Sequence, residues 1–181
     1  MIPKDRPRIE RKTTEQLLAS RKVSDLVCLV GIRGYYSHTM GADGNDVGIY
    51  DDCIVLVSPN VHAAFNANVD PSRLGWNASA RKPMAQLKAG VYRYKIGQHG
   101  ISRGNPYKAL VQAGPVTVLR GDSEETGRFA INIHRGGNTT TSSEGCQTIP
   151  PAQWPAFIAL VETELKRNNA KTLSYVLTSN A

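Results

Sequence analysis

Short β-rich segments, separated by turn residues, are the feature of this sequence that most constrains its fold. They alternate in polarity or are rich in β-branched and aromatic side chains, and Gly, Pro, Asn and Asp cluster between them. Such segments occur at residues 25–32, 53–60, 89–97, 116–121, 128–134 and 171–179. Strands this short, with few helices between them, predict a mainly β domain rather than a doubly wound α/β fold.

Two stretches predict helices. Residues 13–22 begin with a threonine that can cap a short amphipathic helix. Residues 150–169 carry apolar side chains at helical spacing, and Pro155 suits the first turn of that helix. We therefore expect an α+β domain, mainly β with helical additions. A chain of 181 residues forms one domain over residues 1–181, with residues 1–12 as a flexible basic arm.

The chain is basic, with 22 Lys and Arg against 15 Asp and Glu, and its net charge is +7. This charge would attract an anionic partner such as nucleic acid, a membrane surface or an acidic wall polymer, and charge alone does not choose among them. No helix-turn-helix or aromatic-interleaved basic motif indicates nucleic acid. The apolar run at residues 26–32 is too short for a membrane anchor. The charged N-terminal residues also lack the apolar region of a signal peptide.

Three cysteines are too few for a disulfide framework. Cys28 and Cys53 lie in strand-like apolar segments, where cysteine is a small buried hydrophobe. Cys146 differs, because it lies in a loop rich in Gly, Ser and Thr that follows His134. This loop is the candidate site.

The pattern around Cys146 suits a nucleophile. A cysteine becomes reactive when a histidine or backbone N–H groups stabilise its thiolate. Ser143 can cap the loop locally, and Gly145 lets the backbone approach a substrate closely. The amides of Glu144, Gly145 and Cys146 could face a developing oxyanion. His134 ends a predicted strand, which would hold its imidazole rigidly as a general base.

Two other interpretations of the pair stay open at this point. His134 and Cys146 could lie near each other in the sequence by chance, with no role other than packing. They could also bind zinc, which would need two further ligands. The sequence has no CxxC or HxxxH pair, and the other histidines, His38, His62 and His99, are scattered. We predict no metal and no cofactor.

The order of histidine before cysteine, with S-E-G-C at residues 143–146, resembles the L,D-transpeptidase (YkuD-like) catalytic domain family. The stretch LKAGVYRY at 87–94 is similar to the family's glycine turn leading into a strand. The two strand-like segments before His134, and the helix and strand after Cys146, also resemble the family, so the likeness covers about residues 87–178. Papain-like enzymes place cysteine before histidine and fit less well.

This resemblance implies a β-sandwich with a helix after the nucleophile loop. It makes Cys146 the acyl-accepting nucleophile and His134 its base. The carbonyl of Arg135 or Gly136 would orient the histidine, and Gly145 with its neighbouring amides would form the oxyanion hole. The implied substrates are peptidoglycan stem peptides, attacked at a carbonyl that follows an L-centre and precedes a D-residue.

The sequence departs from the family pattern in three places. The spacer between His134 and Cys146 is shorter than usual, Glu144 stands where a second histidine is common, and Thr148 replaces the usual Arg or Asn. These changes weaken the case for cross-linking more than the case for an acyl-enzyme. Candidates for substrate binding are His99, Arg103, Tyr107, Arg135 and Thr148.

We therefore expect a cysteine enzyme that hydrolyses peptidoglycan stem peptides through a thioester. A compact chain without an export signal is typical of phage lysis enzymes and secreted antibacterial effectors, made in the cytoplasm and delivered to the wall by a holin or secretion apparatus. The alternatives are an L,D-transpeptidase of wall maturation and a non-catalytic basic wall-binding module. The oligomeric state is not predicted.

Overall fold

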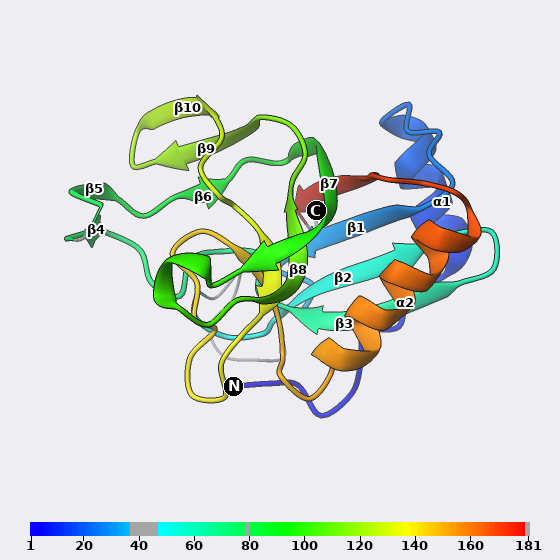
Figure 1. Cartoon of the computed structure of the whole chain (residues 1–181), viewed down its shortest axis with the longest axis horizontal. Helices are drawn as coiled ribbons and strands as arrows, with labels where there is room; N and C mark the ends of the chain where they lie inside the picture. The colour runs from blue at the N-terminus through cyan, green and yellow to red at the C-terminus, as the bar shows by residue number, and fades with distance from the viewer. Residues whose placement is uncertain (37–46, 79, 180–181) are drawn as a thin grey trace.

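The computed structural model describes residues 1–36, 47–78 and 80–179 (Figure 1). The predicted loop 33–52 therefore lies partly outside the described residues, and His38 lies outside them. The helices and strands follow in chain order: α1 (Arg11–Ser20), β1 (Cys28–Arg33), β2 (Asp52–Val57), β3 (His62–Ala67), β4 (Trp76–Asn77), β5 (Lys82–Pro83), β6 (Gln86–Leu87), β7 (Gly90–His99), the 3₁₀ turn η1 (Ile101–Arg103), β8 (Tyr107–Gln112), β9 (Val116–Arg120), β10 (Ser123–Gly127), β11 (Ile133–Arg135), β12 (Gln147–Ile149), α2 (Trp154–Arg167) and β13 (Leu173–Ser179). The expectation of a mainly β chain with helical additions is confirmed.

One large sheet organises the chain, in the order β12-β11-β8-β7-β13-β1-β2-β3. Its neighbours are antiparallel except for the pairs β1–β13 and β11–β12. The sheet curls so that its two edges meet just after β3. There Asn68 and Thr148 exchange backbone hydrogen bonds of 2.9 and 2.7 Å. This bridge ties β12, which follows Cys146, to the opposite end of the sheet.

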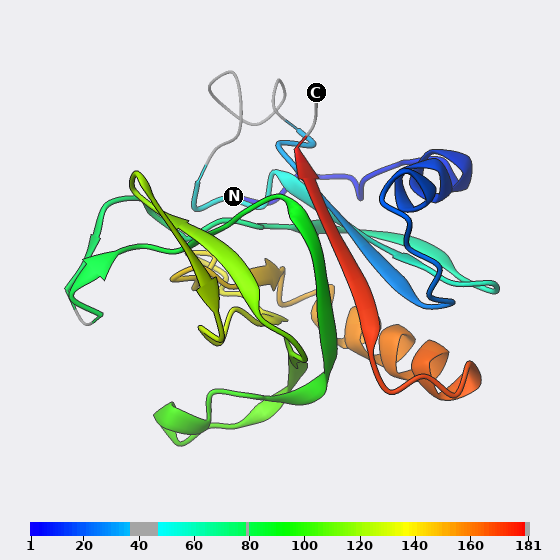
Figure 2. The ribbon, with the colours of Figure 1, turned by 90° about the horizontal axis from the view of Figure 1, so that it is seen from above.

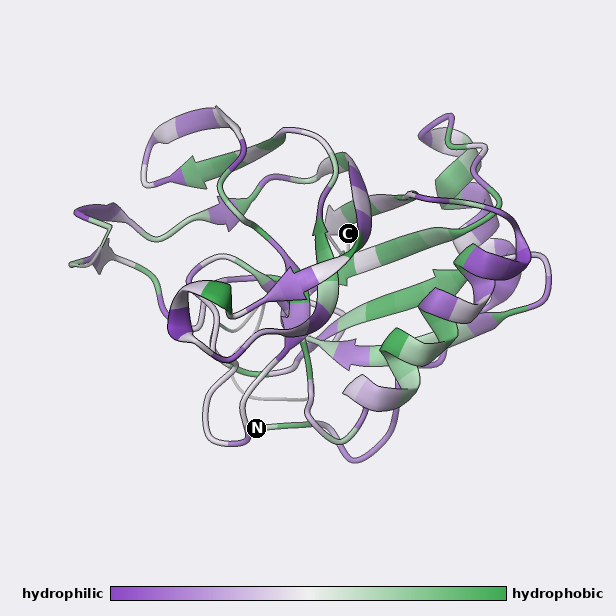
Figure 3. Cartoon of the chain, in the orientation of Figure 1, coloured by the Kyte–Doolittle hydropathy of each residue, from purple (hydrophilic) through white to green (hydrophobic). Residues whose placement is uncertain are grey.

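The central strands are buried on both faces, which explains their continuous apolar sequences. Leu29 and Ile54 face a core shared with α2, whereas Val30 and Val55 face a smaller core beside α1. Figure 2 shows the two helices on opposite faces of the sheet, and Figure 3 shows the apolar residues gathered in its strands. The apolar face predicted for the second helix is confirmed by the burial of Trp154, Phe157, Ile158, Val161 and Leu165. Among the described residues, no helix has the length and apolar character needed to cross a membrane.

A three-stranded sheet, in the order β10-β9-β6, and the short hairpin β4–β5 project from the large sheet (Figure 1). The turn containing η1 projects separately, between β7 and β8 (Figure 2). These projections surround the loop that carries Cys146.

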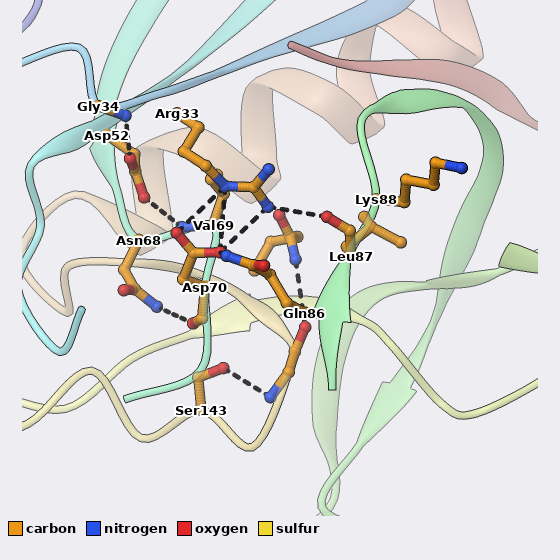
Figure 4. Close-up of polar contacts among 12 residues, drawn as sticks. Arg33, Gly34, Asp52, Asn68, Val69, Asp70, Gln86, Leu87, Lys88 and Ser143 are labelled. Atoms are coloured by element: carbon orange, nitrogen blue, oxygen red, sulfur yellow. Dashed lines mark hydrogen bonds and ion pairs between the residues drawn. The ribbon is translucent and has the colours of Figure 1, made fainter. Parts of the chain in front are cut away.

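A buried ionic network supports the base of these projections (Figure 4). Asp70 is fully buried and accepts hydrogen bonds from Arg33 Nε at 3.1 Å and Gln86 Nε2 at 2.9 Å. The Arg33 guanidinium also donates to the carbonyl of Leu87 at 2.8 Å. The network therefore joins β1, the segment after β3, and β6.

The predicted strand at 128–134 is shorter in the structure and comprises only Ile133–Arg135. The reason is local. Ala130 has a left-handed φ of 55°, and the amides of Phe129 and Ile131 donate to the side chain of Gln112 rather than to a neighbouring strand. Strands β3, β8, β10 and β12 were not predicted, because their sequences are partly polar or very short.

The first twelve residues differ from the expected flexible arm. The Asp5 carbonyl accepts a hydrogen bond from Tyr36 Oη at 3.0 Å, and the Arg8 carbonyl accepts one from Tyr35 Oη at 2.7 Å. Arg6 lies 4.9 Å above the ring of Phe65. Backbone hydrogen bonds and a cation–π contact therefore hold the segment against the sheet.

Candidate active site

The candidate site is a cavity of about 730 Å³, a volume typical of ligand pockets. It lies where the projections meet the end of the large sheet. His99, His134 and Cys146 line it, together with the cations Lys82, Arg103 and Arg120. The described charged residues of the lining thus include three cations and one carboxylate, Glu144.

His134 lies on β11, between β8 and β12, so the sheet holds its backbone on both sides. The side chain is buried, and its Nδ1 lies 2.7 Å from the carbonyl oxygen of Arg135. Because a carbonyl only accepts, Nδ1 carries the hydrogen and Nε2 carries a lone pair. A backbone carbonyl therefore fixes the tautomer that a general base requires.

Cys146 places its sulfur close to both histidines. One ring nitrogen from His99, one from His134 and the Cys146 Sγ all lie within 4.8 Å of one another. The thiol also lies 3.4 Å from the Ala130 carbonyl, which can accept a hydrogen bond from it, and 3.4 Å from the backbone amide of Asn132. That amide would stabilise a thiolate, because it donates toward the sulfur.

The Ser143 hydroxyl holds the loop that carries Cys146 through two hydrogen bonds. It donates to the Cys146 carbonyl at 2.6 Å and accepts from the Gly145 amide at 3.0 Å. Gly145 has a φ of 142°, and a Cβ there would lie 2.6 Å from the Ala85 carbonyl. Only glycine fits this position, where the loop passes close to a neighbouring segment.

The predicted oxyanion hole needs a correction, because the Gly145 amide is already bonded to Ser143. The amide of Cys146 has no hydrogen-bond partner among the described residues, and the same is true of the Glu144 amide. These two amides are therefore the backbone donors of the loop that could still bind an oxyanion.

His99 stacks on His134, with ring centroids 3.9 Å apart and planes 11° apart. Asn132 Nδ2 lies 3.1 Å from His99 Nδ1 and fixes the second ring. Asn132 therefore contacts both His99 and Cys146, one through its side chain and one through its amide. The sequence analysis missed this residue, although its place two residues before His134 in the same segment was a usable signal.

This trio does not fit a tetrahedral metal site. An imidazole binds a metal in the plane of its ring, through one lone pair, and a zinc site needs three or four protein ligands that converge on one ion. Two stacked, nearly parallel rings cannot both direct lone pairs at one ion.

Tyr107 and Arg135 take positions other than those expected from the sequence. The Tyr107 hydroxyl lies 3.0 Å from His134 Nδ1 and 3.3 Å from the Arg135 carbonyl, so it contacts His134 without lining the cavity. The Arg135 guanidinium lies 5.0 Å from the Tyr107 ring centroid. His99 and Arg103 do line the cavity.

Two predicted residues take no part in the site. Thr148 is fully buried in β12, opposite His134 in the strand register, and does not line the cavity. Gly136 packs against Tyr50, where a Cβ would lie 2.1 Å from the tyrosine hydroxyl, and it is the Arg135 carbonyl that orients His134. Lys82 and Arg120, which the sequence analysis did not single out, do line the cavity.

Burial keeps both members of the pair neutral at rest. It raises the pKa of the Cys146 thiol to about 11, and the nearby Glu144 carboxylate also raises it. Burial, with help from His99, lowers the pKa of His134 to about 4. A neutral thiol beside a neutral imidazole is a general-base arrangement, in which the proton moves as the sulfur attacks.

Alkylation of Cys146 should therefore depend steeply on pH. Only the thiolate reacts, so between pH 7 and 9.5 we expect the rate with iodoacetamide to rise about tenfold per pH unit. Cys28 and Cys53 are buried and should stay unmodified in the folded protein. Peptide mapping by mass spectrometry measures all three. A fast, pH-independent reaction of Cys146 near pH 6 would instead reveal a thiolate–imidazolium pair.

Comparisons of the chain with models of protein families, with curated proteins and with solved structures found no match.

Proposed function

We propose that this protein is a cysteine-nucleophile enzyme that hydrolyses peptidoglycan stem peptides through a thioester acyl-enzyme. One observation carries the proposal: Cys146 and His134, whose Nε2 carries the lone pair, lie together in one cavity, and the Cys146 backbone amide has no hydrogen-bond partner among the described residues. Nucleophile, base, orienting carbonyl and oxyanion donor are the parts that acyl transfer requires.

The first half of the reaction forms the thioester. His134 Nε2 takes the proton of the Cys146 thiol as the sulfur attacks the substrate carbonyl. The amide of Cys146 donates to the oxyanion of the tetrahedral intermediate. The imidazolium then gives its proton to the leaving nitrogen, the carbon–nitrogen bond breaks, and an amine with its D-residue departs.

The second half regenerates the enzyme. His134 removes a proton from water, and the hydroxide attacks the thioester carbonyl. Collapse of the second intermediate breaks the carbon–sulfur bond, and the sulfur takes the proton back from His134. The net reaction is peptide plus water to a carboxylic acid and an amine.

The charges of the cavity favour water over an amine as the acceptor. A cross-linking acceptor arrives as an ammonium ion, and Lys82, Arg103 and Arg120 would repel it. Glu144 is the one carboxylate among the described lining residues. The same cations attract the carboxylates of a stem peptide. Hydrolysis is therefore preferred to transpeptidation.

The resemblance of residues 87–178 to L,D-transpeptidases supports the stem-peptide substrate, and we extend the proposal to that family's fold. The order His134 before Cys146 and the orienting carbonyl of Arg135 agree with it. We also propose that the enzyme acts on the cell wall after delivery by a holin or a secretion apparatus.

The test is a digest of purified stem peptides, read by mass spectrometry of both the peptides and the intact protein. New peptide termini, with a transient acyl adduct mapped to Cys146, are expected. Heavier cross-linked or D-amino-acid-exchanged products would assign transpeptidation instead. Neither product nor adduct from any stem peptide would rule out the enzyme for this substrate class and favour a wall-binding module.

A further inference from the structure

Two of the cations that line the cavity form a group that is separate from His134 and Cys146. Lys82 on β5 and Arg120 at the end of β9 both line the cavity, as does Phe129. The Lys82 ammonium and the Arg120 guanidinium each lie 5.8 Å from the Phe129 ring centroid. None of these three residues takes part in the bond-making and bond-breaking steps proposed above. We call Lys82 and Arg120 the cation pair, and Phe129 is the aromatic ring that both cations contact.

Arg120 is unusually buried for an arginine, with only 9% of its side chain exposed. Its Nη1 donates to the Pro83 carbonyl at 2.7 Å, which fixes the guanidinium in place. Its buried Nε has no hydrogen-bond partner among the described residues, although the Glu125 carboxylate lies 3.5 Å away. Because the Nε is buried beside Glu125, the Nη donors that Pro83 does not use are the ones that a carboxylate in the cavity could engage.

Glu125 offsets only part of this charge. Its carboxylate lies 3.6 Å from Lys82 Nζ and 3.5 Å from Arg120 Nε, so one anion is shared between two cations. Both distances exceed those of good hydrogen bonds. The side chain of Glu125 is also 38% exposed, and Glu125 does not line the cavity. Lys82, Arg120 and Glu125 together therefore carry a net charge of +1.

The cation pair adjoins the nucleophile through two short chain connections. Phe129 precedes Ala130, whose carbonyl lies 3.4 Å from the Cys146 sulfur. Pro83, which holds Arg120, is two residues before Ala85, which packs against Gly145. A substrate held at Cys146 can therefore extend a neighbouring residue toward the cation pair.

We propose that Lys82 and Arg120 form a carboxylate-binding subsite that selects substrates with a free carboxylate next to the cleaved bond. The inference rests on the proposed function, because that function supplies the acidic peptide. Arg103 lies in η1, on a different projection, and is not part of this subsite.

The test compares pairs of synthetic stem peptides that differ in a single carboxyl group, present either as the carboxylate or as the carboxamide. Each carboxyl group near the cleaved bond is varied in turn. For one of these carboxyl groups, wild-type kcat/KM should favour the carboxylate by roughly 10- to 100-fold, because the carboxamide cannot form a hydrogen-bonded ion pair with the cations. Arg120→Met should reduce the preference to about twofold or less, chiefly by lowering kcat/KM for the carboxylate peptide.

Three further variants sharpen the result. Lys82→Met, at a partly exposed site, should weaken the preference without threatening the fold, and Glu125→Gln should strengthen it by removing the competing anion. Arg128→Met, an exposed arginine outside the cavity, is the matched control and should change nothing. Equal loss on both peptides in the Lys82 and Arg120 variants, or no preference in the wild type, would overturn the subsite.

A binding measurement separates this inference from the enzyme itself. The Cys146→Ala protein should bind the carboxylate peptide at least about tenfold more tightly than its carboxamide, and Lys82→Met in that background should remove the difference. If the wild type cleaves neither peptide but this binding preference holds, the proposed function fails and the subsite stands. If cleavage occurs without any preference, the subsite fails and the enzyme stands.

Discussion

Replacing Cys146 with alanine abolishes the acyl adduct and lowers the rate of stem-peptide cleavage by at least about 10⁴-fold. In the proposed mechanism the sulfur forms the covalent intermediate, and no other described thiol reaches the cavity, because Cys28 and Cys53 are buried in β1 and β2. Cys28→Ser is the matched control. It keeps a donor for the Asp25 carbonyl, which Cys28 Sγ contacts at 3.1 Å, and should retain full activity.

His134→Gln tests the other member of the pair. Glutamine can still donate toward the Arg135 carbonyl but cannot act as a base, so at pH 7 the rate should fall by about 10²- to 10⁴-fold. Without a base, attack depends on spontaneous ionisation of Cys146, whose pKa burial raises to about 11.

The variant should therefore gain about tenfold in rate per pH unit above pH 7, whereas the wild type should stay nearly constant. A purely structural role of His134 would lower the rate equally at every pH. Unchanged cleavage in Cys146→Ala would contradict the proposed function outright.

Replacing Asp70 with asparagine lowers the free energy of unfolding by about 3–5 kcal/mol, because it leaves a buried guanidinium without its counter-charge. Asp70 is fully buried and Arg33 is only 12% exposed, so water cannot replace the lost partner. Denaturation by urea, with an unchanged slope against urea concentration, measures the loss.

Arg33→Met in the Asp70→Asn background should recover part of this stability, since the unpaired charge is then gone. Lys88→Met is the contrasting control. It breaks the pair with Glu124, whose two side chains are 47% and 49% exposed, and should cost less than about 1 kcal/mol. Additive losses for Arg33 and Asp70 would show that the buried pair is not coupled.

Several elements could be predicted because their signal is local. In the helix that contains Trp154 and Phe157, the apolar residues recur at helical spacing. The continuous apolar sequence of β2 reflects its burial on both faces. Strand β8 carries no such signal, since Tyr107 and Lys108 begin it and Gln112 ends it. It is a strand because β7 and β11 supply hydrogen bonds from elsewhere in the chain.

The sequence by itself determined the mainly β class and singled out His134 and Cys146, because residue order and loop composition are visible along the chain. Only the tertiary structure decided what surrounds them. His99 stacks on His134 from β7, and Arg120 enters the same cavity from β9. Which side chains meet depends on how the sheet curls and pairs its strands, and contacts across such distances leave no periodic trace in a single sequence.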